Sequence, residues 1–134
     1  LSDLSLARVA EACGWMTERP GSANFHVAAT FDEFTAIILL HHDLDAERLA
    51  LDRALQSSSF YIGALGSRQT HDRRRRMLKA AGYSHNDIAR IKAPIGIFGP
   101  ARDASSLALS ILADVAACSI ASPIKDRLAT SRGW

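Results

Sequence analysis

The order of apolar and polar positions along the chain predicts helices that alternate with strands. Residues 35–40 (TAIILL) form a continuous apolar run, which is typical of a strand covered on both faces in a parallel sheet. Residues 60–65 (FYIGAL) repeat this pattern. Each run ends in a polar cluster, HHD or GSR, and helical periodicity follows over residues 44–56 and 67–81. This alternation predicts a doubly wound α/β fold with a mainly parallel sheet flanked by helices.

Weaker or shorter patterns complete the expected set of elements. Apolar spacing predicts a helix over residues 3–13, stopped by Gly14, and a long closing helix over residues 103–120 with Asp103 as its N-cap. The remaining expected elements are short: strands at 15–18 and 25–29, a helix at 84–91 capped by Ser84, and a strand near Ile95 and Ile97.

Length and composition indicate one soluble domain. The chain has 134 residues and no apolar run that approaches the length of a membrane span. We expect one domain over residues 1–121 and a polar tail over residues 122–134. A first residue Leu1 in place of Met suggests processing or a fragment. Cys13 and Cys118 lack metal-ligand spacing, so we interpret both as reduced core residues of a cytoplasmic protein.

The positive charge is local. The net charge is +2, and most basic residues lie between Arg68 and Lys79, which favours an anionic ligand or partner over general nucleic-acid binding. Residues 73–76 are four consecutive arginines within a helix, where successive side chains turn about 100° apart. Only Arg73 and Arg76 are neighbours on its surface. We interpret the run as a solvated helix exterior or as a docking surface for an acidic partner.

The GSR cluster has the features of an anion site. Gly63 and Gly66 would let backbone or ligand come close, and Ser67 can cap the following helix. The first amides of that helix, with their partial positive charge, would then face the strand ends, and Arg68 could clamp an anion there. The alternative is a tight turn at Gly66 and a plain cap at Ser67; the segment alone leaves both interpretations open.

The HHD cluster follows the first secure strand. Because side chains alternate along a strand, His41 and His42 should point in opposite directions and would not chelate one ion easily. Asp43 is a candidate helix cap or acceptor for a ligand hydroxyl, and His42 is a candidate ligand contact. We find no nucleophile with an obvious base and no paired carboxylates, so the sequence does not indicate a self-sufficient hydrolase.

Several segments together resemble one known family. These are TAIILLHHD, YIGALGSRQTHDRRRRMLKAAGYS, IARIKAPIG and ARDASSLALSILADV. They resemble the C-terminal Rossmann-like domain of the XdhC/CoxI accessory proteins, the xanthine dehydrogenase maturation factors. The similarity covers roughly residues 30–118, and its YIGALGSR element is specific.

The resemblance implies a cofactor-binding chaperone that is not itself an enzyme. It would bind the molybdenum cofactor, a pyranopterin that carries a phosphate, and deliver it to a molybdenum hydroxylase such as xanthine dehydrogenase, with a cysteine desulfurase as a further partner. The cofactor-site candidates at matching positions are His42, Asp43, Gly63, Gly66, Ser67, Arg68, Pro94, Gly96 and Arg102. Arg73 and Arg76 are the candidates for partner binding.

The sequence departs from the family pattern in four places, one of which is a short segment between Trp15 and Thr30. Members precede the first helix with a strand and a glycine-rich turn, and this chain begins at that helix. Without that strand, the neighbouring strands could close up, a second copy could complete the sheet, or the chain could be a remnant that no longer binds the cofactor. We expect a homodimer. His41 replaces a threonine, and the loop IFGPARDAS is atypical. Two alternatives stay open: an NAD(P)-binding oxidoreductase domain, against which the missing GxGxxG argues, and a vestigial interaction module.

Overall fold

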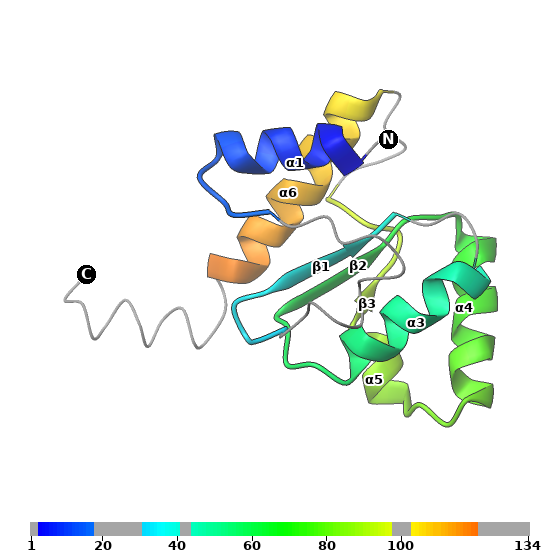
Figure 1. Ribbon diagram of the computed structural model, residues 1–134. Coiled ribbons are helices and arrows are strands. Elements are labelled where there is room, and N and C mark those ends of the chain that lie inside the picture. The colour runs from blue at the N-terminus through cyan, green and yellow to red at the C-terminus, as the bar shows by residue number, and fades with distance from the viewer. Residues whose placement is uncertain (1–2, 18–30, 41–43, 98–102, 121–134) are drawn as a thin grey trace.

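A three-stranded parallel sheet organises the molecule. The structure is a computed structural model that describes residues 3–17, 31–40, 44–97 and 103–120 (Figure 1). The strands β1 (Ala36–Leu39), β2 (Tyr61–Ala64) and β3 (Ile91–Lys92) pair in the order β1-β2-β3. No gap separates these described strands. The predicted α/β class with a parallel sheet is confirmed.

Helices cover both faces of the sheet. Helices α3 (Leu44–Leu55), α4 (Arg68–Ala80) and α5 (His85–Ala89) lie on one face (Figure 1). Helices α1 (Asp3–Ala12) and α6 (Ala104–Ile120) pack against each other on the opposite face. None of the described helices is long and apolar enough to cross a membrane.

The core divides into two clusters because side chains alternate along each strand. Ile37, Leu39 and Ile62 point toward α3, α4 and α5, where Leu51 and Leu78 are fully buried. The other side of the sheet meets α1 and α6. There Tyr61 and Ile95 join a cluster with the apolar residues of both helices, which are Leu6, Ala10, Ala108, Ile111, Leu112 and Val115.

Four expectations about local structure are wrong or shifted. The third strand lies at Ile91–Lys92, whereas Ile95 and Ile97 lie in the loop after it. The helix predicted over 84–91 ends at Ala89, since the chain must extend again to pair with β2. Residues 15–17 form no strand, and residues 25–29 lie outside the described part of the chain. Cys13, expected in the core, is exposed beyond the end of α1, whereas Cys118 is half-buried; both are free.

Candidate functional site

The carboxyl ends of the parallel strands share one edge of the sheet. Leu39 at the end of β1 lies opposite Ala64 at the end of β2, and Lys92 at the end of β3 lies opposite Gly63. The amide of Leu65 continues this pairing by donating to the carbonyl of Leu39 over 2.9 Å. The GSR turn and the loop after β3 therefore both leave the sheet at this edge. In doubly wound folds this is the edge where ligands bind.

The GSR turn starts helix α4 in the predicted way. Gly66 has φ +140°, and a Cβ atom at this position would lie 3.0 Å from the side chain of Thr70. Ser67 is the N-cap, and its Oγ accepts a hydrogen bond from the amide of Thr70 at 3.2 Å. The amides of Arg68 and Gln69 belong to the first turn, where no helical acceptor precedes them. The turn at Gly66 and the cap at Ser67 fit both interpretations of this segment, and the free first-turn amides with exposed Arg68 beside them are compatible with an anion.

Gly63 has a packing reason for being glycine. A Cβ atom there would lie 2.5 Å from Cδ1 of Ile95 and 2.7 Å from Cε1 of Tyr61. The absence of a side chain at Gly63 therefore lets the loop after β3 lie directly on β2. This contact brings the loop close to the sheet, and it accounts for the glycine without a ligand.

The loop after β3 is fixed to helix α6. The Ala93–Pro94 peptide bond is cis, and Gly96 follows with φ +96°. The amide of Ile97 donates to Oγ of Ser110 at 3.0 Å and to its carbonyl at 3.3 Å. A side chain at Gly96 would collide with Ser110. The loop therefore has little freedom between the sheet and α6.

A buried carboxylate fastens the same helix to the sheet. The hydroxyl of Tyr61 donates to Oδ2 of Asp114 at 2.8 Å, and Nζ of Lys92 lies 3.5 Å from Oδ1. Burial, followed by the hydrogen bond to Asp114, raises the pKa of Tyr61 far above its usual range. Tyr61 is consequently a hydrogen-bond donor at every physiological pH. The cluster links β2, β3 and α6.

The predicted site residues divide between this edge and the parts of the chain that are not described. Gly63, Gly66, Ser67, Pro94 and Gly96 lie at the ends of β2 and β3 or in the loops that leave them. Arg68 is the first residue of α4. His42, Asp43 and Arg102 lie outside the described residues. Among the described residues, no group of three or more His, Cys, Asp and Glu side chains could hold a metal ion.

Arg74 is buried, whereas the sequence predicts that the run of four arginines is a solvated helix exterior or a docking surface. Its Nε and Nη2 donate to the two carboxylate oxygens of Glu47 at 2.8 and 3.0 Å, and both side chains are 0% exposed. Nη2 also donates to the carbonyl of Leu65 at 3.1 Å. Leu65 directly precedes Gly66, so Arg74 holds the entry to the GSR turn. Glu47 lies in the first turn of α3 and Arg74 in the middle of α4, so the ion pair links the start of α3 to the centre of α4.

A pattern in the sequence could have revealed this pair. Glu47 precedes Leu51 by four residues and Arg74 precedes Leu78 by four, so each charge lies on the apolar face of its helix. A charge in such a position must find a partner because an isolated buried ion is very costly. Opposite charges on the apolar faces of two consecutive helices therefore predict a buried ion pair.

His71 completes the surroundings of Arg74. Its Nδ1 lies 3.1 Å from Nη1 of Arg74, and it can accept that hydrogen bond when the ring is neutral. Partial burial, and then the positive charges of Arg74 and Arg75, lower the pKa of His71 below its ordinary value of 6.5. The neutral ring is therefore the form that fits the fold.

The lowered pKa of His71 predicts a pH dependence of stability. As pH falls through about 6.5, the unfolded chain binds a proton at this position before the folded chain does, so the free energy of unfolding falls and then levels off below the folded pKa. We expect urea denaturation to show a smaller loss of stability between pH 8 and pH 5 in His71→Gln than in the wild type. His85→Gln, at an exposed histidine, is the control and should retain the wild-type pH dependence. Equal pH dependence in His71→Gln and the wild type would contradict the prediction.

The fold and the strand-end turn define a Rossmann-type α/β domain with an anion-compatible helix start. Comparison with known proteins agrees with this class. The family model of the XdhC Rossmann domain matches residues 3–115 of this sequence. The chain is 48% identical over 97 residues to the molybdenum cofactor insertion chaperone PaoD of Escherichia coli (strain K12), an alignment that covers 72% of this chain and 29% of that protein.

A solved structure, described as a xanthine dehydrogenase from Bacillus halodurans, shares the fold. It aligns with a TM-score of 0.61 at 21% identity, over 81% of this chain and 32% of that one. The chain thus spans about a third of the length of each of these relatives. It belongs to the XdhC family and corresponds to the Rossmann domain of that family.

Proposed function

We propose that this chain binds the molybdenum cofactor and takes part in its insertion into a molybdenum hydroxylase of the xanthine dehydrogenase type. The observation that carries the proposal is the start of α4 at the carboxyl end of β2, where Ser67 caps the helix and Gly66 has φ +140°. The similarity to a molybdenum cofactor insertion chaperone of Escherichia coli supports the choice of cofactor.

The residues at this edge are chemically suited to the phosphate of the cofactor. The first-turn amides of α4 and the partial positive charge of the helix start favour a phosphate group. Arg68 adds a guanidinium that can donate two parallel hydrogen bonds to phosphate oxygens. The cofactor itself would supply the molybdenum chemistry of the hydroxylase; the residues of this chain would bind and orient its phosphate.

The remaining predicted contacts extend the same proposal. Pro94 and Gly96 lie in the loop that Ser110 fixes beside the sheet, and they would border the cofactor from the side of β3. His42, Asp43 and Arg102 keep their sequence-based assignment to the site. Delivery in the cytoplasm, a cysteine desulfurase as a further partner and assembly as a homodimer belong to the proposal as well. No observation on the described residues specifically favours an NAD(P)-dependent oxidoreductase.

Retention of the cofactor by the purified chain tests the proposal. The chain is incubated with molybdopterin and passed through gel filtration, and the pterin fluorescence that elutes with the protein is measured. We expect Arg68→Ala to weaken binding about tenfold or more, because a hydrogen bond to a charged group contributes about 1.5–3 kcal/mol. Ser67→Ala should also weaken binding, because the cap would be lost.

Arg73→Ala is the matched control, since Arg73 is an exposed arginine of the same helix but lies beyond its first turn. Folded protein that retains no pterin would refute cofactor binding by this chain. Equal affinities of the wild type, Arg68→Ala and Ser67→Ala would place the cofactor elsewhere. The elution volume reports at the same time whether the chain is a dimer.

A further inference from the structure

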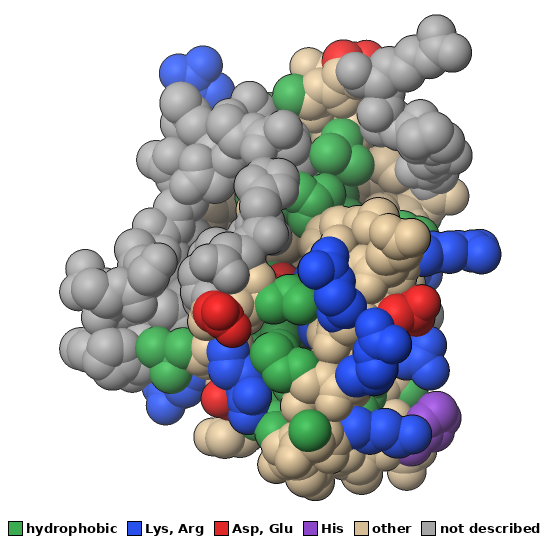
Figure 2. Space-filling view, turned by 90° about the vertical axis from the view of Figure 1, so that its right-hand side faces the viewer, with side chains coloured by type: hydrophobic (Ala, Val, Ile, Leu, Met, Phe, Trp, Pro, Cys, Tyr) green, Lys and Arg blue, Asp and Glu red, His purple; other side chains and the backbone are tan. Residues whose placement is uncertain are grey.

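A basic groove lies between α4 and α5, on the helical layer that covers one face of the sheet. Lys and Arg side chains gather over this side of the molecule (Figure 2). The groove has a volume of about 270 Å³, and the residues that line it are Asp72, Arg75, Arg76, Lys79, His85 and Ile88. Three of its six lining residues are Arg or Lys and one is Asp, so its net character is positive.

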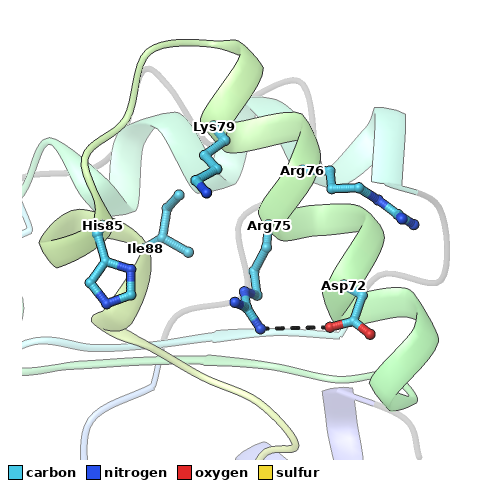
Figure 3. A pocket seen from close by; sticks show the side chains of 6 residues that line it. All are labelled: Asp72, Arg75, Arg76, Lys79, His85 and Ile88. Carbon is cyan, nitrogen blue, oxygen red and sulfur yellow. Dashed lines mark ion pairs between the residues drawn. The ribbon is translucent and has the colours of Figure 1, made fainter.

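The Arg and Lys side chains of the groove all come from α4, and the apolar floor comes from α5. Arg75 and Lys79 are four residues apart on the side of α4 that borders α5; Lys79 points toward α5, whereas the guanidinium of Arg75 lies beside Asp72 (Figure 3). Arg76 points away from α5 and extends the positive surface along the outer side of α4 (Figure 3). Ile88 is buried at the base of the groove, whereas the cationic side chains are exposed.

The charges of this groove are poorly compensated within the described residues. Arg75 makes an ion pair with Asp72 at 3.6 Å, but both side chains are more than half exposed, so the pair contributes little. Arg76 and Lys79 make no ion pair with any described residue. Like charges four residues apart on a helix, such as those of Arg75 and Lys79, destabilise it. The arrangement therefore favours an anionic partner that offsets the repulsion.

We infer that this groove docks an acidic segment of another protein, with carboxylates on Arg75, Arg76 and Lys79 and an aliphatic side chain over Ile88. A small free anion is a poorer match, because the cations are exposed to water and the groove lies on the sides of the two helices, away from the start of α4. Single-stranded nucleic acid is also a poorer match, since the lining residues include no Phe, Tyr or Trp on which bases could stack.

The groove differs from the surface expected from the sequence. Arg76 lines it, as the expected partner surface requires, but Arg73 does not. Helical spacing pairs Arg73 with Arg76, whereas the groove combines Arg76 with Arg75, Lys79 and residues of α5. The inference is independent of cofactor binding, because the groove and the GSR turn share no residue.

Fluorescence anisotropy with a defined probe tests the groove. The probe is a fluorescein-labelled twelve-residue peptide that repeats Glu-Glu-Leu, titrated with the full chain at low ionic strength. We expect saturable binding that weakens as salt is added, and about tenfold weaker binding by Lys79→Glu and by Arg75→Glu. Arg8→Glu, which makes the same charge change at an exposed residue of α1, should stay within about twofold of the wild type.

Several outcomes would overturn the inference. Absence of peptide binding would refute the docking site. Equal losses of peptide affinity in Arg8→Glu and Lys79→Glu would show that binding depends on net charge and not on the groove. A loss in Arg73→Glu as large as that in Lys79→Glu would move the surface to the outer face of α4. Tighter binding of a twelve-nucleotide single-stranded RNA than of the peptide would assign the groove to nucleic acid. A wild-type dimer in gel filtration that is lost in Lys79→Glu would assign it to a second copy of this chain.

Discussion

Replacement of Arg74 by alanine is expected to lower the free energy of unfolding by about 3–5 kcal/mol, because Glu47 would keep a buried charge without a partner. Both side chains are inaccessible to solvent, so water cannot replace the lost hydrogen bonds at 2.8 and 3.0 Å. The carbonyl of Leu65 would lose a donor as well. Urea denaturation of the purified variant measures this change.

Two further variants separate the charge effect from simple loss of a side chain. Arg73→Ala changes an exposed arginine next to Arg74 and should alter the unfolding free energy by no more than about 0.5 kcal/mol. The double variant Arg74→Met/Glu47→Leu removes both charges but keeps much of the volume, so we expect it to recover most of the lost stability. If Arg74→Ala were as stable as Arg73→Ala, the buried ion pair would not hold the two helices.

Gly96→Ala is expected to lower the free energy of unfolding by about 2–5 kcal/mol through two separate effects. A residue with a Cβ atom is strained at φ +96°, which costs about 1–2 kcal/mol. The new Cβ would also collide with Ser110, and overpacking of this kind costs about 1–3 kcal/mol. Thermal or urea denaturation gives the sum of the two effects.

Gly82 provides a matched control for the backbone effect. It has φ +95°, nearly the same as Gly96, but a Cβ atom there would meet nothing within 4 Å. Gly82→Ala should therefore show only the backbone strain. A similar loss of stability in both variants would mean that the loop can move away from Ser110, and that α6 does not restrain it.

Most of the fold could be predicted because burial and periodicity agree in the main elements. The runs at 35–40 and 60–65 became β1 and β2, and Ser67 and Ser84 cap their helices as expected. The third strand was misplaced because Ile95 has the sequence character of a strand residue but is apolar for another reason. It fills the space left by Gly63 and packs on α6, without pairing in the sheet.

The candidate site was predictable only where local geometry decides it. The Gly66 turn and the Ser67 cap follow from residue type and neighbouring pattern. The role of Arg74 was missed because its partner, Glu47, lies 27 residues away on another helix, and the pair emerges only when the apolar faces of both helices are compared. The groove between α4 and α5 depends on the packing of two helices, which the position of each helix in the sequence does not determine.

The two core clusters, one on each face of the sheet, differ in how far apart their residues lie in the sequence. The cluster under α3, α4 and α5 comes from one continuous stretch between Ile37 and Ile91, whereas the opposite cluster joins Leu6 to Val115. Contacts between residues far apart in the chain require more loop-closure entropy and form more slowly. We therefore expect α1 to dock late in folding. Replacement of Leu6 by a smaller apolar residue should then speed unfolding and leave the folding rate nearly unchanged. Slower folding of such a variant in stopped-flow experiments would contradict this order.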